Sequence, residues 1–165
     1  MGNKVQKDMI KPVIEKINET KKIIKENGIL NLSKLDLNCE LMKETIEILK
    51  ENSMPILKFD LSFNHIKEEG SKFLFEYLIS LDSLKELDLY NNPLYDGGVN
   101  NLSTYLIQNK SLKKLTLANI IISQNGMKIL SESLKKNSAL DGDSIKEFVL
   151  FCFNKKKKIR FESCF

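Results

Sequence analysis

Apolar residues recur along this chain with a fixed spacing. The segment 84–111 contains the pattern in its regular form, at Leu84, Leu87, Leu89, Asn92, Leu94, Gly98, Leu102 and Leu106. A shift of 28 residues toward either end reproduces it: Ile56, Phe59, Leu61, Asn64, Ile66, Gly70, Leu74 and Leu78 upstream, and Leu112, Leu115, Leu117, Ile122, Gly126, Leu130 and Leu134 downstream. Self-similarity at one period of this size predicts a solenoid of stacked repeats.

Two different spacings occur within each repeat. Leu87 and Leu89 are two residues apart, so their side chains lie on one face of a strand, whereas Leu102 and Leu106 have the four-residue spacing of a helix. Each repeat is therefore predicted to be a short strand, a turn and a returning helix. The 28-residue length and the G-x-x-x-L-x-x-x-L helical half resemble the ribonuclease-inhibitor type of leucine-rich repeat. The resemblance implies an α/β fold: a short right-handed solenoid with a parallel sheet on its concave face and helices on its convex face.

The predicted boundaries follow from this frame. Residues 1–31 form an N-terminal segment with a capping helix over Pro12–Asn27, because Pro12 suits a first helical turn and Gly28 a helix end. The four repeats are 32–55, 56–83, 84–111 and 112–139, and the first has its strand at Leu35 and Leu37. Residues 140–165 form a C-terminal cap and a basic tail. The apolar run 148–153 has two interpretations: a last strand that closes the sheet, or an aggregation-prone segment followed by protective lysines.

Five residues recur for structural reasons. Asn64 and Asn92 follow their strands, and the resemblance to leucine-rich repeats implies that the amide at this position bonds backbone groups that the sheet leaves unpaired. Gly70, Gly98 and Gly126 begin their helices, where a side chain would obstruct the neighbouring repeat or the backbone requires a positive φ. The fourth repeat has Ile120 at the asparagine position, and Asn119 is expected to serve in its place.

Charge and cysteine content narrow the functional classes. The 165 residues fit one domain, with a net charge of +4 that the tail residues Lys155, Lys156, Lys157, Lys158 and Arg160 exceed by themselves. The repeats are close to neutral, which argues against a basic nucleic-acid-binding body. The odd count of three cysteines, without metal-ligand spacing, indicates a reducing compartment. We expect a cytoplasmic protein, with a nuclear location left open, and no cofactor, metal or transmembrane segment.

The residues between the strand leucines are predicted to lie on the concave face. They are Lys34, Asp36, Asn38, Lys58, Asp60, Ser62, Glu86, Asp88, Tyr90, Lys114 and Thr116. Neighbouring parallel strands are about 4.8 Å apart, so Asp36, Asp60 and Asp88 should form an acidic ladder beside a column of lysines. Two interpretations follow: a solvated, self-compensating charge lattice, or a recognition surface with Tyr90 as its aromatic anchor.

The sequence predicts a non-catalytic module that binds another protein through this concave face. His65 is the only histidine, and no nucleophile elbow, phosphate loop or zinc spacing occurs. A second hypothesis is an adaptor that the basic tail directs to a membrane surface or the nucleus, with N-myristoylation of Gly2 an open question because Gln6 departs from that motif. Resemblance to the Ran-GTPase activator, which has repeats of this type, is the weakest of the three.

Overall fold

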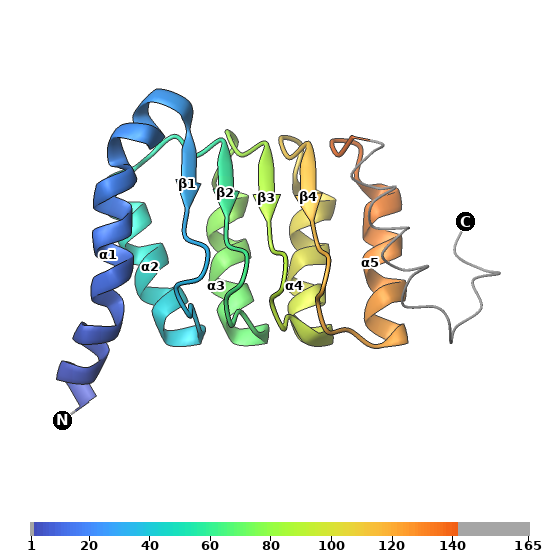
Figure 1. Cartoon of the computed structure of the whole chain (residues 1–165). Helices are drawn as coiled ribbons and strands as arrows, with labels where there is room; N and C mark the ends of the chain where they lie inside the picture. Colours follow the sequence, from blue (N-terminus) through green and yellow to red (C-terminus); the bar gives the residue numbers. More distant parts are fainter. Residues whose placement is uncertain (1, 142–165) are drawn as a thin grey trace.

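The computed structural model describes residues 2–141, with side chains from residue 7 onward, as one layer of strands against one layer of helices (Figure 1). The elements in chain order are α1 (Gly2–Asn27), β1 (Ile29–Asn31), α2 (Cys39–Asn52), β2 (Lys58–Asp60), α3 (Glu68–Ile79), β3 (Glu86–Asp88), α4 (Tyr95–Gln108), β4 (Lys114–Thr116) and α5 (Gln124–Lys136). The predicted α/β class, with strands that alternate with helices, is confirmed in these coarse terms. The predicted C-terminal cap beyond residue 141, the last strand at 148–153 and the basic tail lie outside the described residues.

The four strands form one parallel sheet in the order β1-β2-β3-β4. Ile29, Lys58, Glu86 and Lys114 pair in register across the sheet, which places successive partners 29, 28 and 28 residues apart. Helices α2, α3 and α4 lie side by side behind the sheet, α5 continues their row beyond β4, and α1 lies at the first edge, where it contacts β1 and α2 (Figure 1). Each strand is therefore joined to its neighbour by a helix that returns the chain, as parallel pairing requires.

The core lies between the two layers. The central residue of each strand, Leu30, Phe59, Leu87 or Leu115, is buried, and so is the leucine two positions later. Helix residues at four-residue spacing, such as Leu74 and Leu78, are buried against them. Burying one such side chain contributes about 1.5–3 kcal/mol, so the repeated leucines supply most of the driving force for folding.

The predicted position of the first strand is wrong. β1 is Ile29–Asn31, whereas Leu35 and Leu37 lie in the connection between β1 and α2. In the observed register Leu30 faces Phe59, and the N–H of Leu32 donates to the carbonyl of Asp60 just as that of Leu61 donates to Asp88. Leu32, Leu35 and Leu37 imitate the strand pattern, but the segment that pairs with β2 is the earlier one, in which Leu30 and Leu32 are both buried.

The first helix is longer than its sequence signals predict. It begins at Gly2, so Pro12 lies inside it rather than in its first turn. The buried stripe already begins at Ile10, upstream of the proline, and continues through Val13, Ile17 and Ile24. Packing of this stripe opposes the cost of a proline within a helix.

Gly28 ends α1 in a conformation that other residues avoid. Its φ is +67°, and its N–H donates to the carbonyl of Ile24 at 2.8 Å. A Cβ atom at this position would approach Leu57 Cγ to 2.5 Å. The sharp turn from α1 into β1 therefore depends on glycine.

Buried asparagines tie successive repeats together. Asn64 Oδ1 accepts the backbone N–H groups of Leu35 and Leu37, both at 3.0 Å, and its Nδ2 donates to the carbonyls of Leu32 and Leu61 at 2.9 Å. Asn92 acts in the same way one repeat later: its Oδ1 accepts the N–H of Ile66 at 3.1 Å and its Nδ2 donates to Leu61 at 2.9 Å.

The prediction that Asn119 takes over this role is wrong. Its exposed amide donates to Asn91 Oδ1, whereas Ile120 is buried at the asparagine position. In the two preceding repeats the asparagine accepts the N–H of Leu37 or Ile66, and the residue at the corresponding place before Ile120 is Leu94. The N–H of Leu94 already donates to the carbonyl of Asn92 at 3.0 Å, so it does not need an asparagine side chain at position 120. An apolar residue is therefore tolerated there.

The three repeat glycines have different surroundings. A Cβ at Gly126 would approach Asp96 Oδ1 to 2.4 Å, and one at Gly98 would approach Leu94 Cβ to 3.1 Å, whereas one at Gly70 would meet only ordinary contacts at 3.4 Å or more. Close approach of the neighbouring repeat is thus the stronger constraint at Gly126.

Candidate functional site

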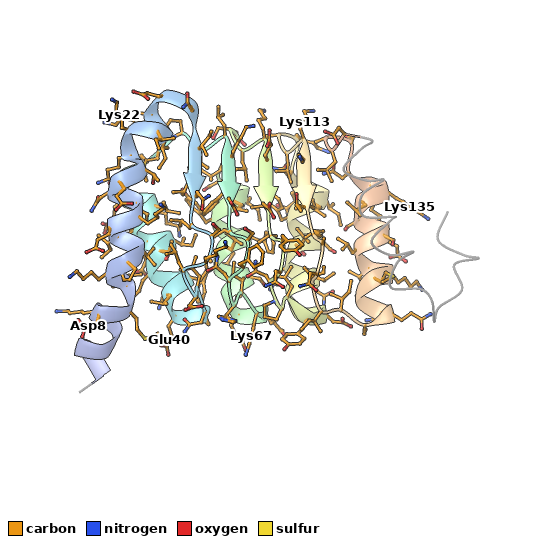
Figure 2. All side chains as sticks on the ribbon, in the orientation of Figure 1. Asp8, Lys22, Glu40, Lys67, Lys113 and Lys135 are labelled. Carbon is orange, nitrogen blue, oxygen red and sulfur yellow. The ribbon has the colours of Figure 1, made fainter. Side chains whose placement is uncertain are left out.

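The sheet presents one face that its own helices do not cover. This open face comprises the outward strand residues, and they border a hollow of about 220 Å³. The outward residues are Ile29, Asn31, Lys58, Asp60, Glu86, Asp88, Lys114 and Thr116. Figure 2 shows side chains projecting across the strands, with the labelled charges Asp8, Lys22, Glu40, Lys67, Lys113 and Lys135 around the outline of the molecule.

Most of the predicted site residues come together here. Lys58, Asp60, Glu86, Asp88, Lys114 and Thr116 all border the hollow, and Ser62 and Tyr90 follow the ends of β2 and β3. Whether they contact a partner remains a prediction.

Three predicted residues lie elsewhere, because β1 is not where the sequence placed it. Lys34 and Asp36 lie in the connection after β1 with φ of 59° and 53°. Asn38 caps α2, where its Oδ1 accepts the N–H of Leu41 at 3.0 Å. Their predicted place in a strand is wrong.

Ile29 and Asn31 occupy the open face in their place, and the sequence prediction missed both. A signal for them exists: Asn31-Leu32-Ser33 parallels Asp60-Leu61-Ser62. The polar column across the strands is therefore Asn31, Asp60, Asp88 and Thr116, and its acidic part is a pair rather than the predicted ladder of three.

The backbone holds this polar column in place. Asp60 Oδ1 accepts the N–H of Ser62 at 2.9 Å, Asp88 Oδ1 accepts that of Tyr90 at 2.8 Å, and Asn31 Oδ1 accepts that of Ser33 at 2.9 Å. Each side chain is thus oriented by its own strand end, and the open face presents its carboxylates in a defined geometry.

Asp88 is a half-buried member of the acidic pair. Burial is the main influence on Asp88 and raises the pKa of its carboxyl group. The N–H of Tyr90 lowers this pKa, the charge of Asp60 raises it again and the ammonium of Lys114 lowers it. Because adjacent carboxylates repel each other, a cation between Asp60 and Asp88 would be favoured.

The neighbouring column is partly self-compensating. Lys58 Nζ lies 2.7 Å from Glu86 Oε1, in an ion pair between β2 and β3 whose side chains are both well exposed. Exposed pairs contribute only about 0–1 kcal/mol to stability. This pair engages Lys58, two residues before Asp60 on β2. The open face thus has opposite charges that pair in one column and two aspartates in the next.

An aromatic edge, formed by Phe63 and Tyr90, borders the acidic pair. The two rings meet edge to face with centroids 5.0 Å apart, and Lys34 Nζ lies 5.3 Å from the centroid of Phe63. Phe63 is 44% exposed and has a φ of 55°. The sequence prediction identified Tyr90 but not Phe63, because Phe63 lies one residue beyond the alternating strand positions.

The single histidine of the sequence lies beside an exposed carboxylate. His65 Nε2 lies 3.4 Å from Asp36 Oδ1, and both side chains are exposed. Within residues 2–141 no three His, Cys, Asp or Glu side chains converge to hold a metal ion. None of the helices in that part of the chain is long and apolar enough to span a membrane.

A second hollow, of about 450 Å³, lies where α4 ends and β4 approaches. Tyr105, Lys85 and Lys110 are among its lining residues, and the buried hydroxyl of Tyr105 has no hydrogen-bond partner among the described residues. Burial raises the pKa of Tyr105, and that of Tyr77 in the preceding repeat to about 12. Both phenols therefore stay protonated at neutral pH and do not supply a base.

No protein-family model matches this chain, and no curated protein sequence matches it. Among solved structures the chain is similar to that of "Leiomodin-1 Actin-Binding Site 2 (ABS2)", with a TM-score of 0.62 and 16% sequence identity. The match covers 87% of this chain and 91% of that chain. At this identity the similarity shows a shared fold, of the leucine-rich-repeat-like α/β kind, and the protein with which it is shared is a binding domain.

Proposed function

We propose that the protein is a non-catalytic interaction module, a short right-handed solenoid of ribonuclease-inhibitor-type repeats that binds another protein on the open, concave face of its sheet. The observation that supports this most strongly is the hollow of about 220 Å³ over the strands, bordered by backbone-anchored carboxylates. The shared fold with an actin-binding domain supports a binding role rather than a catalytic one.

The mechanism is rigid presentation of alternate strand residues. Side chains on one strand repeat every second residue, and neighbouring strands are about 4.8 Å apart, so the open face is a fixed lattice of contact points. The backbone bonds that orient Asp60 and Asp88 reduce the conformational entropy that binding would otherwise cost. A partner with complementary charge is therefore expected to bind without reorganising the sheet.

The test is a pull-down from cell extract with the full chain and a triple variant, Asp60→Lys with Asp88→Lys and Tyr90→Ala. We expect a partner that the wild type captures and the triple variant does not. A matched control is Glu47→Lys with Glu76→Lys, which makes the same change in charge at exposed positions on α2 and α3. Equal capture by wild type and triple variant, with both folded, would contradict the proposed site.

Actin is a second candidate partner, which the fold shared with an actin-binding site of leiomodin-1 favours. Cosedimentation of the full chain with filamentous actin tests it directly. Actin-dependent pelleting that the triple variant abolishes would identify the partner. Absence of pelleting with filamentous actin, together with absence of binding to monomeric actin, would remove actin and leave the interaction module in place.

The basic tail supports a second hypothesis, an adaptor that the tail directs to a membrane surface or the nucleus. We propose a cytoplasmic or nuclear location for the protein. Removal of residues 154–165 deletes its cationic run. If the tail provides a membrane or nuclear address, the truncated chain should redistribute in cells. An unchanged location would leave the repeats as the only functional part.

A further inference from the structure

Phe63 occupies a backbone position that its counterparts fill differently. The residue that follows the strand end has a left-handed conformation in all four repeats: Lys34, Phe63, Asn91 and Asn119 have φ values of 59°, 55°, 55° and 59°. Their N–H groups form the same ladder, with Lys34 donating to Ser62, Phe63 to Tyr90 and Asn91 to Ala118.

Asparagine tolerates this conformation better than other non-glycine residues, whereas a bulky side chain is strained there. The two later repeats have asparagine, and the second has phenylalanine with 44% of its surface exposed. A strained backbone and an exposed apolar ring both oppose stability. Strained backbone positions of this kind cluster at functional sites.

The aromatic edge continues directly into the acidic pair. Tyr90 follows Asp88 by two residues and donates its N–H to Asp88 Oδ1 at 2.8 Å. Phe63 follows Asp60 by three residues, and its ring lies 5.0 Å from that of Tyr90. Asp60 and Asp88 face each other in register on β2 and β3, about 4.8 Å apart. Two carboxylates and two rings thus come from neighbouring positions at the ends of β2 and β3.

Charge decides which partner fits this surface. Within residues 7–141, neither Asp60 nor Asp88 forms a direct ion pair: Lys58 is paired with Glu86, and Lys114 on β4 acts on Asp88 only through its charge. A guanidinium group presents several N–H donors in one plane, so it can bond both carboxylates at once, which an ammonium does less well. An arginine side chain therefore complements the acidic pair.

The spacing along the strand defines a second contact. Asp88 and Tyr90 are two residues apart, and an extended partner segment has the same distance of about 6.8 Å between alternate side chains. A segment with arginine over the acidic pair therefore places the side chain two residues away over the aromatic edge. An apolar side chain there would cover the exposed ring of Phe63.

We propose that the open face binds a partner protein through an extended segment of the pattern arginine, any residue, apolar residue, in which the guanidinium bonds Asp60 and Asp88 and the apolar side chain covers Phe63 and Tyr90. This inference rests on the proposed function and names the chemistry of the partner.

The test uses three blocked peptides and the ¹⁵N-labelled full chain at low ionic strength. The first peptide is Arg-Ser-Leu, the second has citrulline in place of arginine, and the third has glycine in place of leucine. We expect Arg-Ser-Leu to shift the amide resonances of Asp60, Phe63, Asp88 and Tyr90. Citrulline has the shape of arginine without its charge, so the second peptide should produce no shifts, and the third should bind more weakly.

Protein variants provide the matched comparison. Phe63→Asn should fold, because it installs the residue that the next two repeats have at this position, and should weaken the binding of Arg-Ser-Leu about tenfold or more. Ile107→Gln removes an apolar side chain of the same 44% exposure from α4 and should leave binding unchanged. Asp60→Asn with Asp88→Asn should abolish the preference for arginine over citrulline.

The outcomes separate this inference from the function on which it rests. Equal shifts with arginine and citrulline, or no shifts up to tens of millimolar peptide, would overturn the proposed recognition of arginine. If the pull-down still lost its partner with the triple variant, the interaction module would stand and only its chemistry would be wrong. If the pull-down also failed, both proposals would fall.

Discussion

Replacement of Asn64 by alanine should destabilise the protein more than the same truncation at Asn92 or Asn119. The Asn64 amide is buried and bonds five backbone groups of two repeats, at Leu32, Leu35, Leu37 and Leu61 at 2.9–3.0 Å and at Ser62 at 3.3 Å. Alanine leaves two N–H donors, those of Leu35 and Leu37, without their acceptor. A buried group without its partner costs about 1–3 kcal/mol, so the expected loss is about 3 kcal/mol in the free energy of unfolding.

The structure also predicts a rank order. Asn92→Ala removes the acceptor of one N–H group, that of Ile66, and should cost about half as much as Asn64→Ala. Asn119→Ala deletes the same atoms from an exposed side chain whose amide donates to Asn91, and should change stability by less than about 0.5 kcal/mol.

Urea titration followed by circular dichroism measures these differences. The midpoint should fall with an unchanged m-value, because the area exposed on unfolding is the same. A loss of about 3 kcal/mol lowers Tm by roughly 10 °C in a chain of this length. If Asn64→Ala were as stable as Asn119→Ala, the inference that these amides connect the repeats would be refuted.

Three further predictions use the same titration. Gly28→Ala should lose more than about 1 kcal/mol, because alanine is strained at a φ of +67° and its Cβ collides with Leu57; full stability would show that the turn can relax. Phe63→Asn should stay within about 1 kcal/mol of the wild type, because relief of backbone strain offsets the lost contact with Tyr90; a larger loss would make Phe63 a structural residue. The raised pKa of Asp88 means that the folded state holds its proton more tightly than the unfolded state, so ionisation opposes folding as pH rises past the ordinary aspartate value. Asp88→Asn should therefore be more stable than the wild type at neutral pH, and this gain should vanish under acid conditions where both side chains are uncharged.

The sequence predicted the fold well where packing alone determined it. The regular spacing around Leu87 and Leu102 located β3 and α4, because a buried strand and a buried helix face require those spacings. It failed at β1, where Leu35 and Leu37 imitate the pattern. Only pairing with β2 distinguishes the true strand, and pairing is a property of two segments.

In the candidate site, too, the sequence predicted the residues that follow from strand spacing and missed those that depend on the backbone between repeats. Residues such as Asp60 and Asp88 were predicted because strands alternate their faces, and six of the predicted residues do border the hollow. Phe63 was missed because it follows the strand, where the backbone turns to a left-handed conformation that the leucine spacing does not encode. Its neighbour Tyr90 comes from the next repeat, so the aromatic edge exists only in three dimensions.

Because the repeats share one backbone conformation, a residue that differs from its counterparts in the other repeats can be examined for a structural or a functional cause. Ile120 and Phe63 both replace an asparagine that other repeats have. Ile120 is buried, and the backbone donor that would need an asparagine there, the N–H of Leu94, is already satisfied by Asn92, so local hydrogen bonding explains the departure. Phe63 is exposed and strained, and its counterparts show that asparagine fits the same backbone. Our proposal accounts for this exposed phenylalanine, beside an acidic pair without an ion-pair partner within the described residues, by contact with another molecule.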